Sequence, residues 1–219
     1  MAGNNNATID SSLRIAITGC GVMVLLKAAA YFFTESAAVF ADITQSLVHL
    51  AALGFASFSL RYANQPSVTK RSPEQPNFIL FSSGFEGSMI IFAGLVTVFV
   101  ALAKYFAGEE LNHIEAGTLL TVVSAGISSL FGFYLLREGR SQRSVVMQSN
   151  GKHLLFSCIL SLVVISSLLF YSYAEGYHWI DPLAAALLGI YTFFSGIITL
   201  RKSFDGLLDK ADPHIIRQL

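Results

Sequence analysis

The chain contains a long apolar stretch, Phe78–Phe106, which reads FILFSSGFEGSMIIFAGLVTVFVALAKYF. No charged residue lies between Glu86 and Lys104. A helix needs about 20 mostly apolar residues to cross the hydrocarbon core of a bilayer. Because lipid offers no hydrogen bonds, every backbone group must be paired within the segment, which makes such a span an α-helix. The stretch therefore predicts a transmembrane helix that is long enough to tilt or to project from the bilayer.

Five further stretches of the same character lie on either side of this one. The six predicted spans are Leu13–Phe33, Ser36–Tyr62, Phe78–Phe106, Ala116–Leu136, Gly151–Tyr173 and Ile180–Leu200. We therefore expect an all-α membrane protein with a six-helix bundle. Residues 1–12 would form a polar N-terminal tail, residues 13–202 the transmembrane domain, and residues 203–219 a short cytoplasmic tail.

The overall composition agrees with a membrane protein. Hydrophobic residues make up 53% of the chain and charged residues only 13%, whereas soluble domains carry about 25% charged residues. The net charge of +0 gives no basic field that would favour nucleic acid. The two cysteines, Cys20 and Cys158, lie inside apolar spans and do not form a disulfide framework. They are expected to be buried apolar side chains, with a thiolate ligand as the alternative.

Charge in the loops predicts the orientation. Basic residues group on one side of the predicted membrane: Arg14, Arg61, Lys70, Arg71, Arg137, Arg140, Arg143, Lys152, Arg201 and Lys202. Acidic residues group on the other side: Glu35, Glu109, Glu110, Glu115 and Glu175. Because Lys and Arg accumulate in the cytoplasm, both termini should be cytoplasmic, which requires an even number of spans. The loop Asn64–Asn77, with three prolines, is then an irregular cytoplasmic connector, and Tyr177–Pro182 is a short external turn.

Two of the predicted spans carry polar stripes with the same spacing. The stripes consist of Asp42, Gln45 and His49 in the second span and Asn150, His153 and Ser157 in the fifth. Residues three and four apart share one face of a helix. Two such helices could face each other and enclose a small polar site at membrane depth.

These side chains are candidate metal ligands. A pair at i and i+4 on each of two helices can supply four ligands to one ion. His49 and His153 would be the strong ligands, and Gln45 and Ser157 the weak ones. Asp42 would bind directly or orient a ligand. A single histidine in a membrane helix is more often a hydrogen-bonded packing residue, but two histidines in matched stripes favour a site.

Other intramembrane polar residues are interpreted differently. Snorkelling or helix packing is the favoured interpretation of Lys27, and pairing with an acid such as Asp42 is the alternative. Glu86 is expected to face the cytoplasmic interface. The small residues of Ser124–Ser129 and Gly189–Gly196 would let helices approach closely.

Several of these motifs together resemble the cation diffusion facilitators. The resemblance rests on Leu26-Lys27, on the stretch Glu35–Asp42 followed by Ser46, on Asp181-Pro182 at the start of the sixth span, and on Ser203 with Gly206–Asp209 after it. It covers essentially the whole chain and rests on the order and spacing of the motifs.

The resemblance implies a non-enzymatic exporter of divalent metals, usually a proton antiporter and usually a homodimer, in a bilayer that we expect to be a bacterial cytoplasmic (inner) membrane. It places the transport site at Gln45, His49, His153 and Ser157. Zn²⁺ would be the foremost cargo, followed by Fe, Co, Cd and Mn ions, because two imidazoles suit transition metals better than Mg²⁺ or Ca²⁺. No cofactor is expected.

The chain departs from the family pattern in two ways. The family site usually carries His or Asp followed by Asp on each helix, whereas here Gln45 and Ser157 are neutral and His49 replaces an acid. Fewer carboxylates should weaken binding or change the ion. The family also usually carries a cytoplasmic domain after the sixth span, whereas this chain stops at Leu219, so the chain is either truncated or a short form.

These departures keep other functions open. One alternative is a transport-inactive relative that acts as a partner in a membrane complex, and another is a transporter of a different ion on the same fold. An intramembrane enzyme is disfavoured, because the sequence shows no Ser–His–Asp set, His-Glu-x-x-His motif or paired Asp motif at membrane depth.

Overall fold

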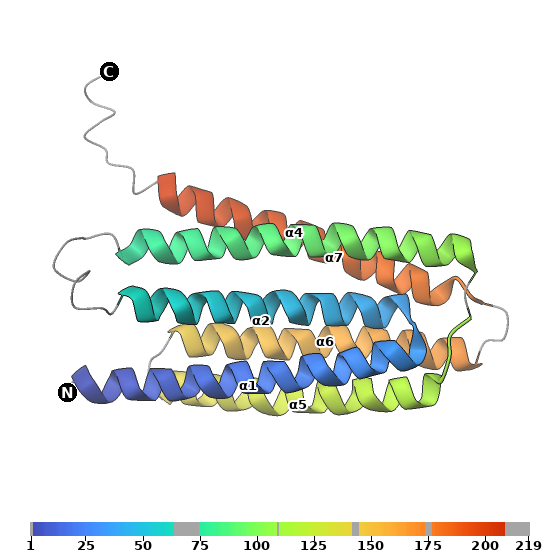
Figure 1. Ribbon diagram of the computed structural model, residues 1–219, viewed down its shortest axis with the longest axis horizontal. Coiled ribbons are helices and arrows are strands. Elements are labelled where there is room, and N and C mark those ends of the chain that lie inside the picture. Colours follow the sequence, from blue (N-terminus) through green and yellow to red (C-terminus); the bar gives the residue numbers. More distant parts are fainter. Residues whose placement is uncertain (1, 64–74, 109, 142–144, 174–176, 209–219) are drawn as a thin grey trace, which may run out of the picture.

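The computed structural model describes residues 2–63, 75–108, 110–141, 145–173 and 177–208, with side chains described for 17–55, 83–108, 110–141, 147–173 and 177–205. The helices are α1 (Ala2–Thr34), α2 (Ala37–Ala63), α4 (Gln75–Ala107), α5 (Ile114–Ser141), α6 (Val145–Tyr173) and α7 (Ile180–Leu208) (Figure 1). All six are long and apolar enough to cross a membrane. The prediction of an all-α, six-span bundle is confirmed.

The helices extend slightly beyond the predicted spans. Helix α4 begins at Gln75, so the end of the predicted connector Asn64–Asn77 is helical, and residues 64–74 lie outside the described part. Helix α1 begins and α7 ends at the same end of the bundle (Figure 1), as an even number of spans requires. Which end faces the cytoplasm stays a prediction, and so do the two tails. Of the loop charges behind that prediction, Lys70, Arg71, Glu109, Arg143 and Glu175 lie outside the described residues.

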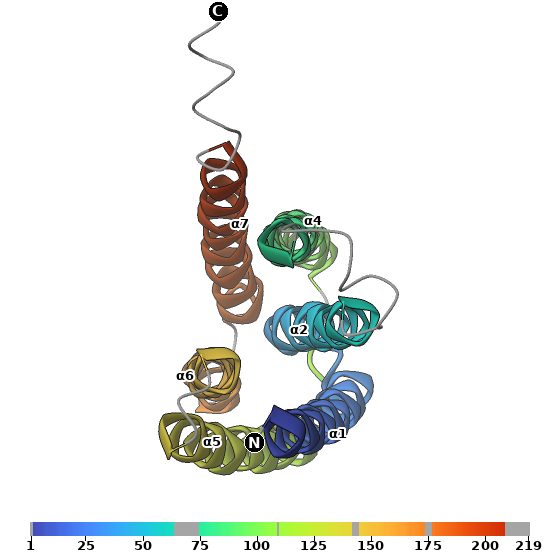
Figure 2. The same ribbon diagram turned by 90° about the vertical axis from the view of Figure 1, so that its left-hand side faces the viewer.

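Helix α2 occupies the centre of the arrangement. It contacts α1, α4, α6 and α7. The most extensive interface joins α4 and α7, and the next joins α5 and α6. Figure 2 shows α4 and α7 as a pair beside α2, while α1, α5 and α6 lie on the other side of α2. The α4–α7 pair therefore meets the other helices through the contacts of α2 with α4 and α7 and through the contact of α6 with α7.

Glycine permits the close approach of α4 and α7. A Cβ atom at Gly94 would lie 2.6 Å from the backbone nitrogen of Phe193, and one at Gly196 would lie 2.7 Å from that of Ile91. No side chain fits at such distances, so the helix backbones pack directly against each other. The prediction that Gly189–Gly196 serves helix packing is confirmed.

The turn between α1 and α2 is fixed by a residue from α7. Glu35 has a positive φ of 52°, which ends α1 and lets α2 start two residues later. The Asp181 carboxylate accepts hydrogen bonds from Ser36 Oγ (2.5 Å) and from the backbone N–H of Ala37 (2.6 Å) and Ala38 (3.4 Å). These N–H groups have no partner within α2, so Asp181 caps α2 from a neighbouring helix.

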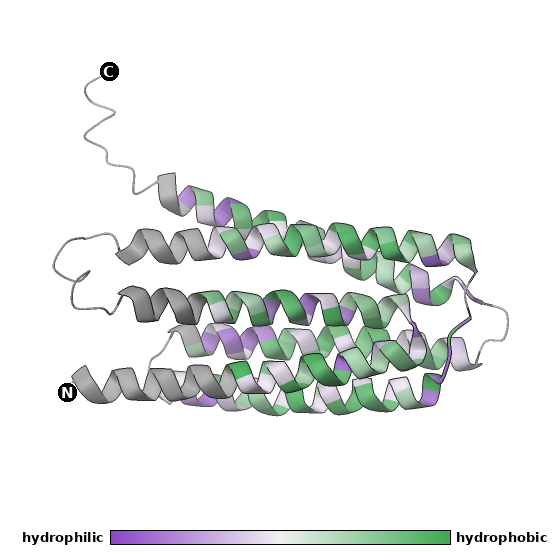
Figure 3. Cartoon of the chain, viewed as in Figure 1, coloured by the Kyte–Doolittle hydropathy of each residue, from purple (hydrophilic) through white to green (hydrophobic). Residues whose placement is uncertain are grey.

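The polarity of the bundle matches a lipid environment. Large apolar side chains such as Phe92, Phe99 and Leu130 are exposed along the helices, and Figure 3 shows apolar residues dominating the middle of the helices. By contrast, Lys27, Asp42 and Asp181 are only 1–2% exposed. The chain is a multi-pass integral membrane protein, and these three charged side chains lie in its interior.

Candidate functional site

Two histidines from different helices meet inside the bundle. The rings of His49 on α2 and His153 on α6 are stacked, with centroids 3.9 Å apart and an interplanar angle of 19°. His49 is only 7% exposed, and neither of its ring nitrogens has a hydrogen-bond partner. A buried polar atom without a partner is unfavourable and rare in native proteins. These two nitrogens are therefore available to a ligand.

The helical spacing of the sequence brings two more predicted residues to this place. Gln45 precedes His49 by one turn, and Ser157 follows His153 by one turn. All four side chains line one small cavity of about 10 Å³. The described residues that line it are Cys20, Met23, Gln45, Ser46, His49, His153, Leu154 and Ser157. The four positions that the family resemblance implied thus lie together, on the facing sides of α2 and α6.

A second, larger cavity adjoins the same histidines. Its volume is about 90 Å³, and its lining is Gln45, Val48, His49, Glu86, Ile90, His153, Phe156, Tyr191, Thr192 and Ser195. It lies where α2 and α6 meet the α4–α7 pair. The volume would hold about three waters at the density of the liquid.

Glu86 on α4 is the functional candidate that the sequence interpretation missed. It was expected to face the cytoplasmic interface, but it lines the larger cavity together with His49 and His153. The signal was present, because an ionisable residue inside an apolar span is usually functional. What the sequence could not give was the rotation of α4 that directs this carboxylate toward α2 and α6.

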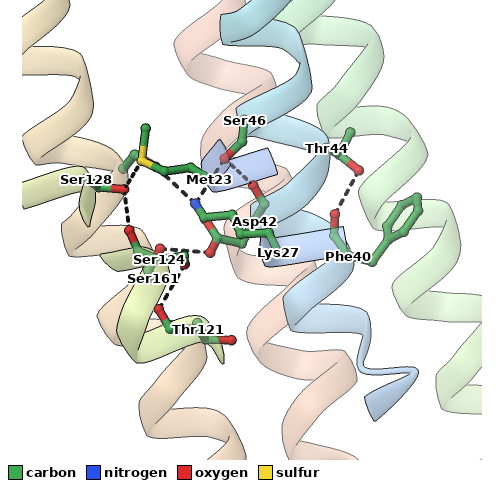
Figure 4. Close-up of polar contacts among 11 residues, drawn as sticks. Met23, Lys27, Phe40, Asp42, Thr44, Ser46, Thr121, Ser124, Ser128 and Ser161 are labelled. Carbon is green, nitrogen blue, oxygen red and sulfur yellow. Dashed lines mark hydrogen bonds and ion pairs between the residues drawn. The ribbon is translucent and has the colours of Figure 1, made fainter. Parts of the chain in front are cut away.

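Asp42 has a different partner from the one that the stripe suggested. Its Oδ1 accepts a hydrogen bond from Lys27 Nζ at 2.7 Å, and its Oδ2 accepts one from Ser161 Oγ at 2.8 Å (Figure 4). Lys27 also donates to Ser46 Oγ (2.9 Å) and Ser157 Oγ (3.2 Å). The favoured interpretation of Lys27 as a snorkelling or packing residue is wrong, because α2 offers it a buried carboxylate. Asp42 is engaged in an ion pair and does not line either cavity.

Asn150 is also outside the site. It lies one turn before His153 on α6 and is partly buried, but it lines neither of the two cavities. The stripe on α6 is therefore shorter than the spacing alone suggested, and it comprises His153 and Ser157.

The placement of the rings limits how an ion can be held. Imidazole lone pairs lie in the ring plane, so the lone pairs of two stacked rings lie in nearly parallel planes and do not converge on a point between the rings. Among the described residues, no three His, Cys, Asp or Glu side chains are grouped closely enough to hold a metal ion. Binding an ion between both rings thus requires rotation of at least one ring, together with oxygen donors such as those of Gln45 and Glu86.

The fold and the site together define a class: a multi-pass helical membrane protein with a polar pocket at membrane depth. The sequence profile described as "Cation efflux transmembrane domain" matches residues 13–208. The chain belongs to this family, the cation diffusion facilitators, and the resemblance seen in the sequence is confirmed.

Individual relatives support this assignment. The chain is similar to an uncharacterized transporter of Synechocystis (27% identical over 190 residues, 86% of this chain and 60% of the relative). It is also similar to the metal cation efflux system protein CzcD of Cupriavidus metallidurans (24% identical, 91% of this chain, 62% of the relative). A third relative is the cation-efflux pump FieF of Serratia proteamaculans (23% identical, 97% and 70%). The chain thus spans less than two thirds of the first and second of these proteins.

Proposed function

We propose that the protein exports a divalent transition-metal ion through a site between α2 and α6 that contains Gln45, His49, His153 and Ser157. The observation that carries this proposal is the buried His49 ring, whose two nitrogens lack partners while it stacks on His153 at membrane depth. A buried imidazole whose nitrogens have no hydrogen-bond partner suits a ligand that is itself the transported species.

The donor set favours transition metals. Imidazole nitrogen prefers Zn²⁺, Fe²⁺ and Co²⁺ over Mg²⁺ and Ca²⁺. Zn²⁺ is therefore the foremost candidate, followed by Fe, Co, Cd and Mn ions, and two of the relatives are named as metal cation or cation efflux proteins. Glu86 supports the proposal further, because among the described residues it is the only acidic side chain that lines either of the two cavities.

Transport in this proposal is coupled to protons. Imidazole binds a metal when neutral and releases it when protonated. Two rings with centroids 3.9 Å apart would repel each other if both were protonated. Proton uptake would thus part the rings and expel the ion. Alternation between the two sides would then arise from rocking of the α4–α7 pair against α2 and α6, in a protein that we propose to be a symmetric homodimer.

The first prediction tests the histidine pair. In proteoliposomes, the double substitution His49→Ala/His153→Ala should reduce Zn²⁺ transport to the level of protein-free vesicles, because it removes both nitrogen donors. Calorimetry on the same purified variant should show no Zn²⁺ binding. The matched control is His113→Ala/His178→Ala, which removes two exposed histidines outside the site and should leave both measurements unchanged. Full transport by the folded site variant would refute the proposal.

A second candidate function is a transport-inactive partner subunit. The commitment of Asp42 to Lys27, together with the neutral Gln45 and Ser157, favours it because the site then lacks the usual carboxylates. It predicts that the folded wild-type protein binds none of the candidate metals and co-purifies with another membrane protein. Zn²⁺ binding that is lost in the histidine variant would exclude it.

A further inference from the structure

We infer that Lys27 is a resident cation that sets ion selectivity: its ammonium group occupies an oxygen-lined cation position beside the histidine cavity and withholds those oxygens from the transported ion. This inference rests on the proposed function, because it concerns which ions the site accepts. The position consists of Asp42, Ser46 and Ser157, which contact Lys27, and Ser161, which completes the bonding of Asp42.

The ammonium group is fully coordinated in the way that a small cation would be. Nζ carries three protons, and it has three oxygen acceptors at 2.7, 2.9 and 3.2 Å. Lys27 is 1% exposed, so water does not take part in its coordination to any large extent. The acceptors come from both α2 and α6. One side chain of α1 thus fills a position that the other two helices build.

This position is continuous with the proposed ion site. Ser46 and Ser157 contact Lys27, and both also line the small cavity beside the histidines. Ser157 lies one helical turn after His153 and is the fourth residue of the proposed metal site. Because its oxygen accepts a hydrogen bond from an ammonium group, it is a poor donor to a dication.

The chemistry of the two positions differs. Around Lys27 the donors are one carboxylate and hydroxyl groups, a set that suits hard cations such as Mn²⁺ and Mg²⁺. Around the histidines the donors are imidazole nitrogens, which suit Zn²⁺. With Lys27 in place only the second position is open, so the resident ammonium group favours the softer metals. If Lys27 served only as a structural partner of Asp42, it would not affect which metal the protein binds.

The test compares ion binding to purified protein in nanodiscs by calorimetry, with Zn²⁺ and Mn²⁺ as probes. We expect Lys27→Met to bind Mn²⁺. Relative to wild type, the ratio of its Kd for Mn²⁺ to its Kd for Zn²⁺ should fall about tenfold or more, which is the size of effect typical when residues around metal ligands are changed. Lys27→Met/Asp42→Asn removes the carboxylate as well and should not gain Mn²⁺ binding. Lys152→Met, at an exposed lysine on α6, is the control and should behave as wild type.

Removing Lys27 alone leaves the buried Asp42 carboxylate without its counter-charge, although Ser161 still donates to it, so this variant can be unstable. In that case the thermal midpoint of Lys27→Met should rise with Mn²⁺ concentration, since an ion that replaces the ammonium group binds the folded state. The inference is overturned if folded Lys27→Met keeps the wild-type selectivity. It is equally overturned if unstable Lys27→Met is not stabilised by Mn²⁺ while the double variant folds. Lys27 would then be only a structural partner of Asp42.

Failure of the proposed function gives a different pattern. If wild-type protein does not bind Zn²⁺, the histidine site is wrong, whatever Lys27→Met does with Mn²⁺. If wild-type protein binds Zn²⁺ through the histidines and Lys27→Met shows unchanged selectivity, only the inference about Lys27 is wrong.

Discussion

Lys27 and Glu86 are charged side chains from α1 and α4, the two helices that flank α2. They differ in whether an opposite charge neutralises them. Lys27 on α1 is neutralised by Asp42 at 2.7 Å, so this pair contributes no net charge. Glu86 on α4 lines the larger cavity, which both histidine rings also line. If the imidazoles are neutral when they bind metal, Glu86 carries the negative charge that a dication needs in a medium of low dielectric constant.

At the residue scale, this charge balance predicts the effect of Glu86→Gln. The substitution keeps the size of the side chain but removes its charge, so the Kd for Zn²⁺ measured by calorimetry should rise about 10- to 100-fold. Glu86→Asp should retain part of the affinity. Glu115→Gln, at an exposed glutamate in the first turn of α5, is the control and should have no effect. Equal affinity in Glu86→Gln and wild type would show that this carboxylate plays no part in binding.

The residues of the candidate site were predictable only in part. Gln45, His49, His153 and Ser157 followed from helical spacing and from the family resemblance, because both depend on sequence alone. The partner of Asp42 and the position of Glu86 did not follow from either. They depend on how α1 and α4 are rotated about their axes relative to α2, and near-uniform apolar spans carry little periodic signal to fix that rotation.

At the element scale, the start of α2 depends on a carboxylate of α7. Asp181 accepts hydrogen bonds from Ser36 Oγ and from the N–H groups of Ala37 and Ala38. It is 1% exposed, so water cannot easily replace these bonds. The sequence showed Asp181-Pro182 at a helix start, and that placement is confirmed by α7. The capping of α2 could not be predicted, because it joins positions 144 residues apart.

Asp181→Ala should therefore lower the free energy of unfolding. The loss should be about 2 kcal/mol, since a cap is removed and buried N–H groups lose their acceptor. Unfolding in mixed detergent micelles, followed by circular dichroism, would measure it. Asp181→Asn should also be destabilising, because an amide NH₂ would face N–H donors. The matched control on the same helix is Asp205→Asn, at an exposed aspartate. Unchanged stability of Asp181→Ala would exclude the capping role.

At the scale of the whole molecule, the larger cavity lies where the α4–α7 pair meets α2 and α6, whereas the small cavity is lined from α1, α2 and α6. Backbone contact at Gly94 and Gly196 ties α4 to α7, and α2 and α6 carry the histidines. The number of spans was predictable, because lipid imposes a length on every helix. The pairing of α4 with α7 was not predictable, since the six apolar runs do not indicate which helices pack against each other. This pairing matters for function, because Ser195 on α7 and Glu86 on α4 reach the histidines only across the boundary of this pair with α2 and α6.

If an ion bound at the histidines draws the α4–α7 pair toward α2 and α6, access to the larger cavity should depend on Zn²⁺. A cysteine at position 195, introduced as Ser195→Cys with Cys20 and Cys158 replaced by Ala, should react with a small methanethiosulfonate reagent, and Zn²⁺ should slow that reaction. The protection should vanish when His49→Ala/His153→Ala is added, since the ion then has no nitrogen donors. Ser141→Cys, at an exposed position at the end of α5 that lines neither cavity, should react equally with and without Zn²⁺. If Zn²⁺ still protects the cysteine after the histidines are removed, the ion binds elsewhere. The motion of the α4–α7 pair would then not depend on the histidine site.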